Sequence, residues 1–181
     1  PPMEASACGS EKLPAVERAL IRLKANSVTS LDLLAKDLGE DGAGLFASAL
    51  KANTSLTELG LGGNAIADQG TAVIADGLRA NRTLRTLRLV NNGISELGAE
   101  SLCGALGSSA LTSLGLGHNN LGDAGAGVLA GLLRVNRSLT SLSLYGNNIS
   151  DSGLQLLADA LASNTSLTRL GLGWNAIGDE G

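Results

Sequence analysis

The feature that most constrains this chain is a unit of 28 residues, once shortened to 27, that occurs six times in succession. A self-similar period of this length predicts stacked units, because one short unit cannot bury its own apolar face. In every copy a leucine follows three residues after the first apolar position, and a second leucine follows two residues later. The first apolar positions are Val28, Leu56, Leu84, Leu111, Leu139 and Leu167.

The unit reads L-x-x-L-x-L-x-x-N-x-(L/I)-x-(D/E)-x-G. In Leu59-Gly60-Leu61 the apolar residues alternate, as in a short strand with one buried face. The asparagine that follows can donate to and accept from the backbone, so stacked copies predict an asparagine ladder. Lys36 takes this place in the first copy and predicts an irregular or exposed turn there. The ladder positions are Asn64, Asn92, Asn119, Asn147 and Asn175.

The second half of each unit predicts a helix, because apolar residues recur there at a spacing of four. We expect helices at 69–80, 97–107, 124–135 and 152–163. Asp68, Asp123 and Asp151 are expected to cap the first turns of these helices. An asparagine follows most of the helices and predicts a left-handed cap at their carboxyl ends. These asparagines are Asn53, Asn81, Asn136 and Asn164, and each also begins a glycosylation sequon, which we interpret as a consequence of the repeat.

The repeated motif resembles the leucine-rich repeat family over residues 11–181. The period and the helix that follows the glycine are similar to its ribonuclease-inhibitor-type branch, which includes the sensor ends of NOD-like receptors and the activator of the Ran GTPase. The expected fold class is an α/β solenoid shaped as a horseshoe arc. A parallel β-sheet would line the concave face, with α-helices on the convex face, because strands pack more closely than helices do.

Three segments are expected along the chain. Residues 1–10 are small and polar and predict a disordered tail. Residues 11–25 carry Val16, Leu20 and Leu23 at helical spacing, which predicts an N-terminal helix or cap. Residues 26–181 hold the six repeats, of which the last is truncated at Gly181. Because that edge would expose apolar residues, we expect the chain to be part of a longer protein.

Composition argues against several functions. The net charge of −4 disfavours a general nucleic-acid binder, and no apolar run is long enough to span a membrane. Cys8 and Cys103 cannot form a disulfide framework, which favours a reducing, cytoplasmic location. Cys103 occupies a small position of the helix and is interpreted as a buried structural thiol.

Signals for catalysis are weak. His118 is the single histidine, so paired imidazoles cannot hold a metal ion, and we expect neither a metal nor a cofactor. The Gly-x-Gly groups at 60–62, 115–117 and 171–173 lie inside expected strands and do not fit a phosphate-binding loop. The chain is therefore not expected to be an enzyme.

The phase of the repeat predicts which side chains leave the concave face. Most of these positions hold glycine or serine, while the single Tyr and the single Trp of the chain both fall among them. Trp, Tyr and Arg are enriched in interface hot spots. The alternative is that Trp174 covers loop packing and that Tyr145 is an incidental surface residue. The proposed partner-binding strip consists of Glu58, Arg88, His118, Tyr145, Arg169 and Trp174.

These observations favour a protein-binding scaffold within a larger intracellular protein, with another protein as its partner and no nucleic acid or membrane. Two alternatives stay open. A GTPase-activating role is implied only by the resemblance to the Ran activator, and a structural subunit of a large assembly would need shape alone. The sequence leaves the oligomeric state open.

Overall fold

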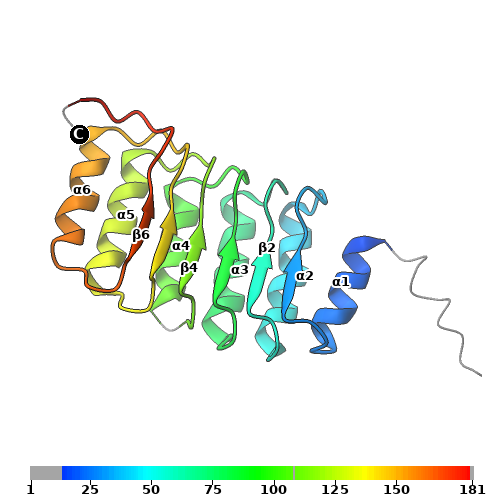
Figure 1. Cartoon of the computed structure of the whole chain (residues 1–181). Helices are drawn as coiled ribbons and strands as arrows, with labels where there is room; N and C mark the ends of the chain where they lie inside the picture. The colour runs from blue at the N-terminus through cyan, green and yellow to red at the C-terminus, as the bar shows by residue number, and fades with distance from the viewer. Residues whose placement is uncertain (1–13, 108, 180–181) are drawn as a thin grey trace, which may run out of the picture.

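The computed structural model describes residues 14–107 and 109–179, so the tail expected at residues 1–10 lies outside the described part of the chain. Six helices alternate with six three-residue strands along the described residues (Figure 1). The helices are α1 (Ala15–Lys24), α2 (Gly39–Ala52), α3 (Ala67–Ala80), α4 (Glu96–Leu106), α5 (Gly122–Val135) and α6 (Asp151–Leu161). The strands are β1 (Ser30–Asp32), β2 (Glu58–Gly60), β3 (Thr86–Arg88), β4 (Ser113–Gly115), β5 (Ser141–Ser143) and β6 (Arg169–Gly171).

The strands form one parallel sheet in chain order, β1 to β6. Its register joins equivalent leucines of successive units, for example Leu59 with Leu87. Figure 1 shows the strands in one layer and the helices in a second layer behind them. Strands stand about 4.8 Å apart and helices about 8–10 Å apart, so the stack curves with the sheet on its inner side. The expected α/β solenoid, with a concave sheet and convex helices, is confirmed.

The core is a continuous layer of leucine between the sheet and the helices. Leu59 in β2 and Leu61 just after it are fully buried. On the side of α3 that faces the sheet, Ile74 is fully buried and Leu78 is 1 % exposed. The same positions are buried in the third and fourth units, and in the fifth unit Leu161 is partly buried. At the N-terminal end, α1 packs beside α2 and places Leu23 in the same core.

Buried asparagines connect each unit to its neighbours. The side-chain amide of Asn119 donates to the carbonyl oxygens of Leu89 and Leu116, both at 2.9 Å. Its side-chain oxygen accepts from the backbone N–H groups of Asn92 at 2.9 Å and Ile94 at 3.1 Å. One amide thus joins three segments of backbone that would otherwise be buried without partners. Lys36 at the first ladder position is exposed, yet its backbone N–H donates to the Asn64 side chain.

The predicted left-handed caps at the helix ends are wrong. Asn53, Asn81 and Asn136 have extended backbones, with φ between −78° and −74°. They are buried, and they form a second ladder at the opposite edge of the sheet layer. The Asn81 amide donates to the carbonyl oxygens of Leu50 and Asn53, and its oxygen accepts from the Leu84 N–H. Cross-unit bonds of this kind explain why asparagine recurs at these sequons.

The prediction that each aspartate caps its own helix is also wrong. The helices α3 and α5 begin at Ala67 and Gly122, before Asp68 and Asp123, so neither carboxylate caps its own helix. Asp68 instead accepts from the Ser95 hydroxyl at 2.6 Å and from the Ser95 and Gly98 N–H groups at 2.8 and 3.0 Å. Asp68 therefore holds the start of the next helix along the stack.

Asp123 repeats this arrangement with Ser150, and Asp151 accepts from the Gly178 N–H at 2.8 Å. The hydrogen bond from the Ser150 hydroxyl, followed by that from its backbone N–H, lowers the pKa of Asp123 below its ordinary value of 3.8. The true N-caps of α4 and α6 are Ser95 and Ser150, whose hydroxyl oxygens accept from the Leu97 and Ser152 N–H groups.

Candidate protein-binding face

The outward side of the sheet alternates between side-chain-bearing strands and bare ones. In units one, three and five, the last residue of the strand and the residue two positions later both carry an outward side chain. In units two, four and six, both of these positions are glycine. The bearing pairs are Asp32 and Leu34, Arg88 and Val90, and Ser143 and Tyr145. The bare pairs are Gly60 and Gly62, Gly115 and Gly117, and Gly171 and Gly173. Sequence reasoning recognised each glycine pair but missed this two-unit period, which the printed repeat carries.

The residue before each ladder asparagine has a left-handed backbone. Its φ is 52° at His118 and 57° at Trp174, and Gly146 takes the same position between them at 64°. Ala35, Gly63 and Asn91 share this conformation in the other units. The turn places the side chain at this position on the rim of the concave face, where the strands end.

Three rings form a row along this rim. The His118 and Tyr145 ring centroids lie 5.0 Å apart in an edge-to-face arrangement, and those of Tyr145 and Trp174 lie 5.9 Å apart. Glycines make the space for them, because a Cβ at Gly146 would stand 2.7 Å from His118 Nδ1 and one at Gly173 would stand 3.1 Å from the Tyr145 ring. Trp174 is 81 % exposed, so this large ring lies in solvent rather than over a loop core.

The structure divides the six residues of the predicted strip into three groups. His118, Tyr145 and Trp174 form the ring row over β4 to β6. Glu58 and Arg88 form an ion pair, with 3.7 Å between nitrogen and oxygen, and about half of each side chain is exposed. Arg169 is exposed at the start of β6, at the opposite end of that unit's strand from Trp174.

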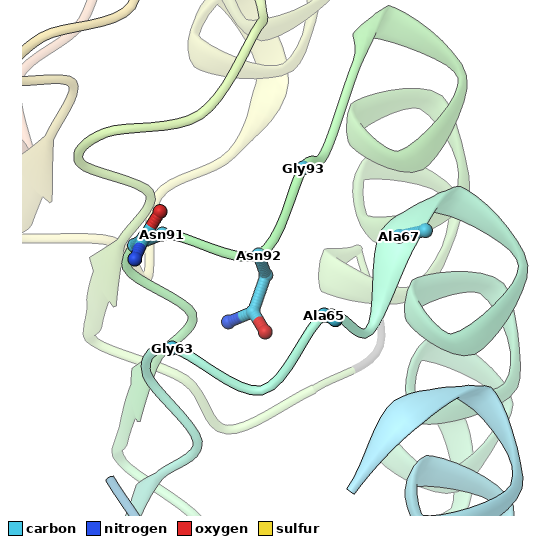
Figure 2. Close-up of a pocket in the computed structure, with 6 residues that line it drawn as sticks. All are labelled: Gly63, Ala65, Ala67, Asn91, Asn92 and Gly93. Carbon is cyan, nitrogen blue, oxygen red and sulfur yellow. The ribbon is translucent and has the colours of Figure 1, made fainter. Parts of the chain in front are cut away.

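A shallow hollow of about 450 Å³ lies on the same rim, between the second and third units. Figure 2 shows its lining, which is mostly Gly63, Ala65, Ala67 and Gly93 around the Asn92 side chain. The Asn92 amide is already bonded to the Leu61 carbonyl oxygen, and its oxygen accepts from the Asn64 N–H. This hollow therefore presents small side chains and an amide whose donor and acceptor already have partners within the chain.

Residues 14–107 and 109–179 hold no group of three or more His, Cys, Asp or Glu side chains that could bind a metal ion. Burial, and then the nearby Glu100 carboxylate, raise the pKa of Cys103 to about 12, so its thiol stays protonated and inert at neutral pH. Among the same residues, none of the helices combines the length and apolarity needed to cross a membrane.

The comparisons with known proteins agree with this architecture. The chain is similar in structure to one described as leiomodin-1 actin-binding site 2, with 23 % identity, coverage of 88 % of this chain and 80 % of that chain, and a TM-score of 0.55. It is also similar to the tropomodulin C-terminal domain of Caenorhabditis elegans, with 19 % identity, coverage of 88 % and 83 %, and a TM-score of 0.55. Identities this low speak for a common fold alone.

No curated protein matches the chain. The sequence profile described as Leucine Rich repeat, in contrast, matches residues 52–75, 80–103, 107–130, 135–158 and 163–181, which together make up more than half of the chain. The chain therefore belongs to the Leucine Rich repeat family.

Proposed function

We propose that this chain is a non-enzymatic, protein-binding repeat domain of a larger cytoplasmic protein, of the ribonuclease-inhibitor-type branch, and that it binds its partner on the concave face. The row of three rings, His118, Tyr145 and Trp174, carries the proposal. A ring that is 81 % exposed and in contact with Tyr145 offers a partner a large apolar surface on a face that otherwise bears mostly glycine and serine. Trp and Tyr are the side chains that most often dominate binding free energy.

The backbone at Trp174 supports the same conclusion. A left-handed conformation costs a non-glycine residue about 1–2 kcal/mol, and two other units place glycine at this position. The ring is little buried within the chain, so its burial on folding offsets little of this conformational free energy. Protein binding accounts for a side chain that folding does not require.

The fold class suggests where to look first for the partner. The leiomodin-1 structure is described as an actin-binding site, which makes actin the first protein to test. The acidic balance of the chain supports a protein partner rather than a nucleic acid. The alternatives of a GTPase activator and a structural subunit gain no specific residue from the described part of the chain.

The test is retention of a partner by the immobilised chain, with actin co-sedimentation as its first arm. We expect Tyr145→Ala combined with Trp174→Ala to weaken retention at least about tenfold. The matched control combines Val135→Ala and Leu156→Ala, which removes two exposed apolar side chains from α5 and α6 on the helix side. If the ring variant folds like the wild type and keeps its partner, the proposal is wrong.

A further inference from the structure

On the concave face, the strands with outward side chains form ridges, and the strands with outward glycines form troughs between them. Above β2 the trough is filled, because a Cβ at Gly60 would stand 2.6 Å from the Asp32 carboxylate and one at Gly62 would stand 3.1 Å from Leu34. Above β4 it is open at Gly115, where a Cβ would meet Arg88 only at ordinary contact distance, 3.7 Å. Above β6 the trough is open at Gly171, where a Cβ would meet Ser143 only at 3.5 Å, whereas the Tyr145 ring covers Gly173 and would stand 3.1 Å from a Cβ there.

The two troughs are open at Gly115 on β4 and at Gly171 on β6, and they flank the ridge of Ser143 and Tyr145 on β5. Neighbouring strands stand about 4.8 Å apart, so the two troughs repeat at about 9.6 Å along the stack. A polyproline II helix brings every third residue to the same side at about 9.3 Å, three steps of about 3.1 Å. An extended β-strand repeats on one face at only about 6.6 Å, and one turn of α-helix advances about 5.4 Å. Of these conformations, the polyproline II helix fits the trough spacing.

The side chains around these troughs have the chemistry that such a segment needs. Proline-rich helices dock in grooves lined by aromatic rings. Tyr145 borders both troughs, because its carbonyl oxygen would stand 3.3 Å from a Cβ at Gly117 and its ring 3.1 Å from a Cβ at Gly173. The ridge ring of Tyr145 would lie between two successive proline contacts, one in each trough.

Charge adds a second requirement on the partner. The outward strand positions over β4 to β6 carry no carboxylate, and their single charged side chain is Arg169. Within residues 14–107 and 109–179, Arg169 takes part in no ion pair, whereas Arg88 is paired with Glu58. An acidic side chain on the edge of the segment that faces the start of β6 would complement this guanidinium.

We propose that the face over β4 to β6 binds a proline-rich segment in the polyproline II conformation, with acidic residues on one edge. Prolines at every third position occupy the troughs above β4 and β6, and a carboxylate reaches Arg169. This inference rests on the proposed function, because it specifies the partner of the same face.

The experiment uses the whole chain and synthetic peptides. Trp174 is the single tryptophan, so its fluorescence reports directly on the ring row, and calorimetry provides a second readout. The probes are Pro-Pro-Asp repeated three times, its neutral Pro-Pro-Asn counterpart, and the flexible Gly-Ser-Asp counterpart of equal charge. We expect saturable binding of the acidic proline peptide, weaker binding of the neutral one, and the weakest binding of the flexible one.

Variants locate the contacts. Gly115→Ala and Gly171→Ala place a methyl group in each trough at ordinary contact distances and should weaken binding about fivefold or more without disturbing the fold. Gly131→Ala makes the same chemical change on α5, with open space around it, and should leave binding unchanged. Arg169→Gln should weaken the acidic peptide about two- to fivefold and leave the neutral peptide unaffected.

Equal binding of the flexible and proline peptides would overturn the proposal, and so would tight binding by both trough variants. If no proline peptide binds while retention of the protein partner still requires Tyr145 and Trp174, this inference fails and the proposed function stands. If retention does not depend on those two rings, the proposed function itself has failed.

Discussion

One backbone position shows how a single residue separates stability from binding in this stack. The turn before each ladder asparagine is left-handed in every unit, which glycine adopts without strain. Gly63 and Gly146 follow that preference, whereas Ala35, Asn91, His118 and Trp174 place a side chain on the same left-handed backbone. Of these four, His118 and Trp174 lie in the ring row, where each ring contacts Tyr145.

Trp174→Gly is therefore expected to stabilise the fold while it removes binding. Relief of the left-handed strain is worth about 1–2 kcal/mol, and loss of a solvent-exposed ring contact costs about 0.5 kcal/mol, so the free energy of unfolding should rise by about 1 kcal/mol. Urea unfolding measures this change.

The reverse substitution provides the control. Gly146→Ala puts a Cβ on the same left-handed backbone and 2.7 Å from the His118 ring, and should lower the free energy of unfolding by about 1 kcal/mol or more. A clear loss of stability in Trp174→Gly would show that the ring serves folding instead.

At the scale of elements, successive helices begin in two alternating ways. The helices α3 and α5 begin on left-handed Ala67 and Gly122, whereas α4 and α6 begin after a serine cap held by an aspartate of the preceding unit. The sequence predicted the helices and an aspartate near their first turns. It assigned those aspartates to the wrong helix, because capping preferences describe contacts within one helix and not contacts across 27 residues.

Asp123 makes this link between units sensitive to pH. Its pKa is lowered in the folded chain by the Ser150 hydroxyl and then by the Ser150 N–H, so the folded state favours the carboxylate. The resulting stabilisation is fully present above the ordinary pKa of 3.8 and is lost as the pH falls through the lowered value. We expect the free energy of unfolding of the wild type to fall in that acidic range more steeply than that of Asp123→Asn.

Urea unfolding of both chains at a series of pH values checks this prediction. Ser150→Ala serves as a second variant, because it removes the hydroxyl that lowers the pKa most and should also lose about 1 kcal/mol of N-cap stabilisation at neutral pH. Identical slopes for wild type and Asp123→Asn below the ordinary pKa would contradict the assignment.

For the whole molecule, the curvature is set by how closely neighbouring helices approach. The leucine periodicity was enough to predict the layers, the parallel sheet and the inward residues such as Leu59 and Leu87, because one buried face imposes a strict period. It did not predict the second ladder through Asn81, or the trough at Gly115, because these depend on contacts between units and not on the pattern within one.

Gly77 is a further contact of this kind, and it gives a test of the packing between units. A Cβ at Gly77 in α3 would stand 2.8 Å from the carbonyl oxygen of Ala47 in α2, and that backbone atom cannot yield without moving the helix. Gly77→Ala should therefore lower the free energy of unfolding by about 1–3 kcal/mol, even though alanine favours a helix. Gly131→Ala on α5, with nothing within 4 Å, should instead raise it by about 0.5–1 kcal/mol. The two glycines receive the same methyl group, so opposite shifts in the urea midpoint at an unchanged m-value would separate helix spacing from helix propensity. Two shifts of the same sign would mean that α2 and α3 have more freedom to separate than this close approach implies.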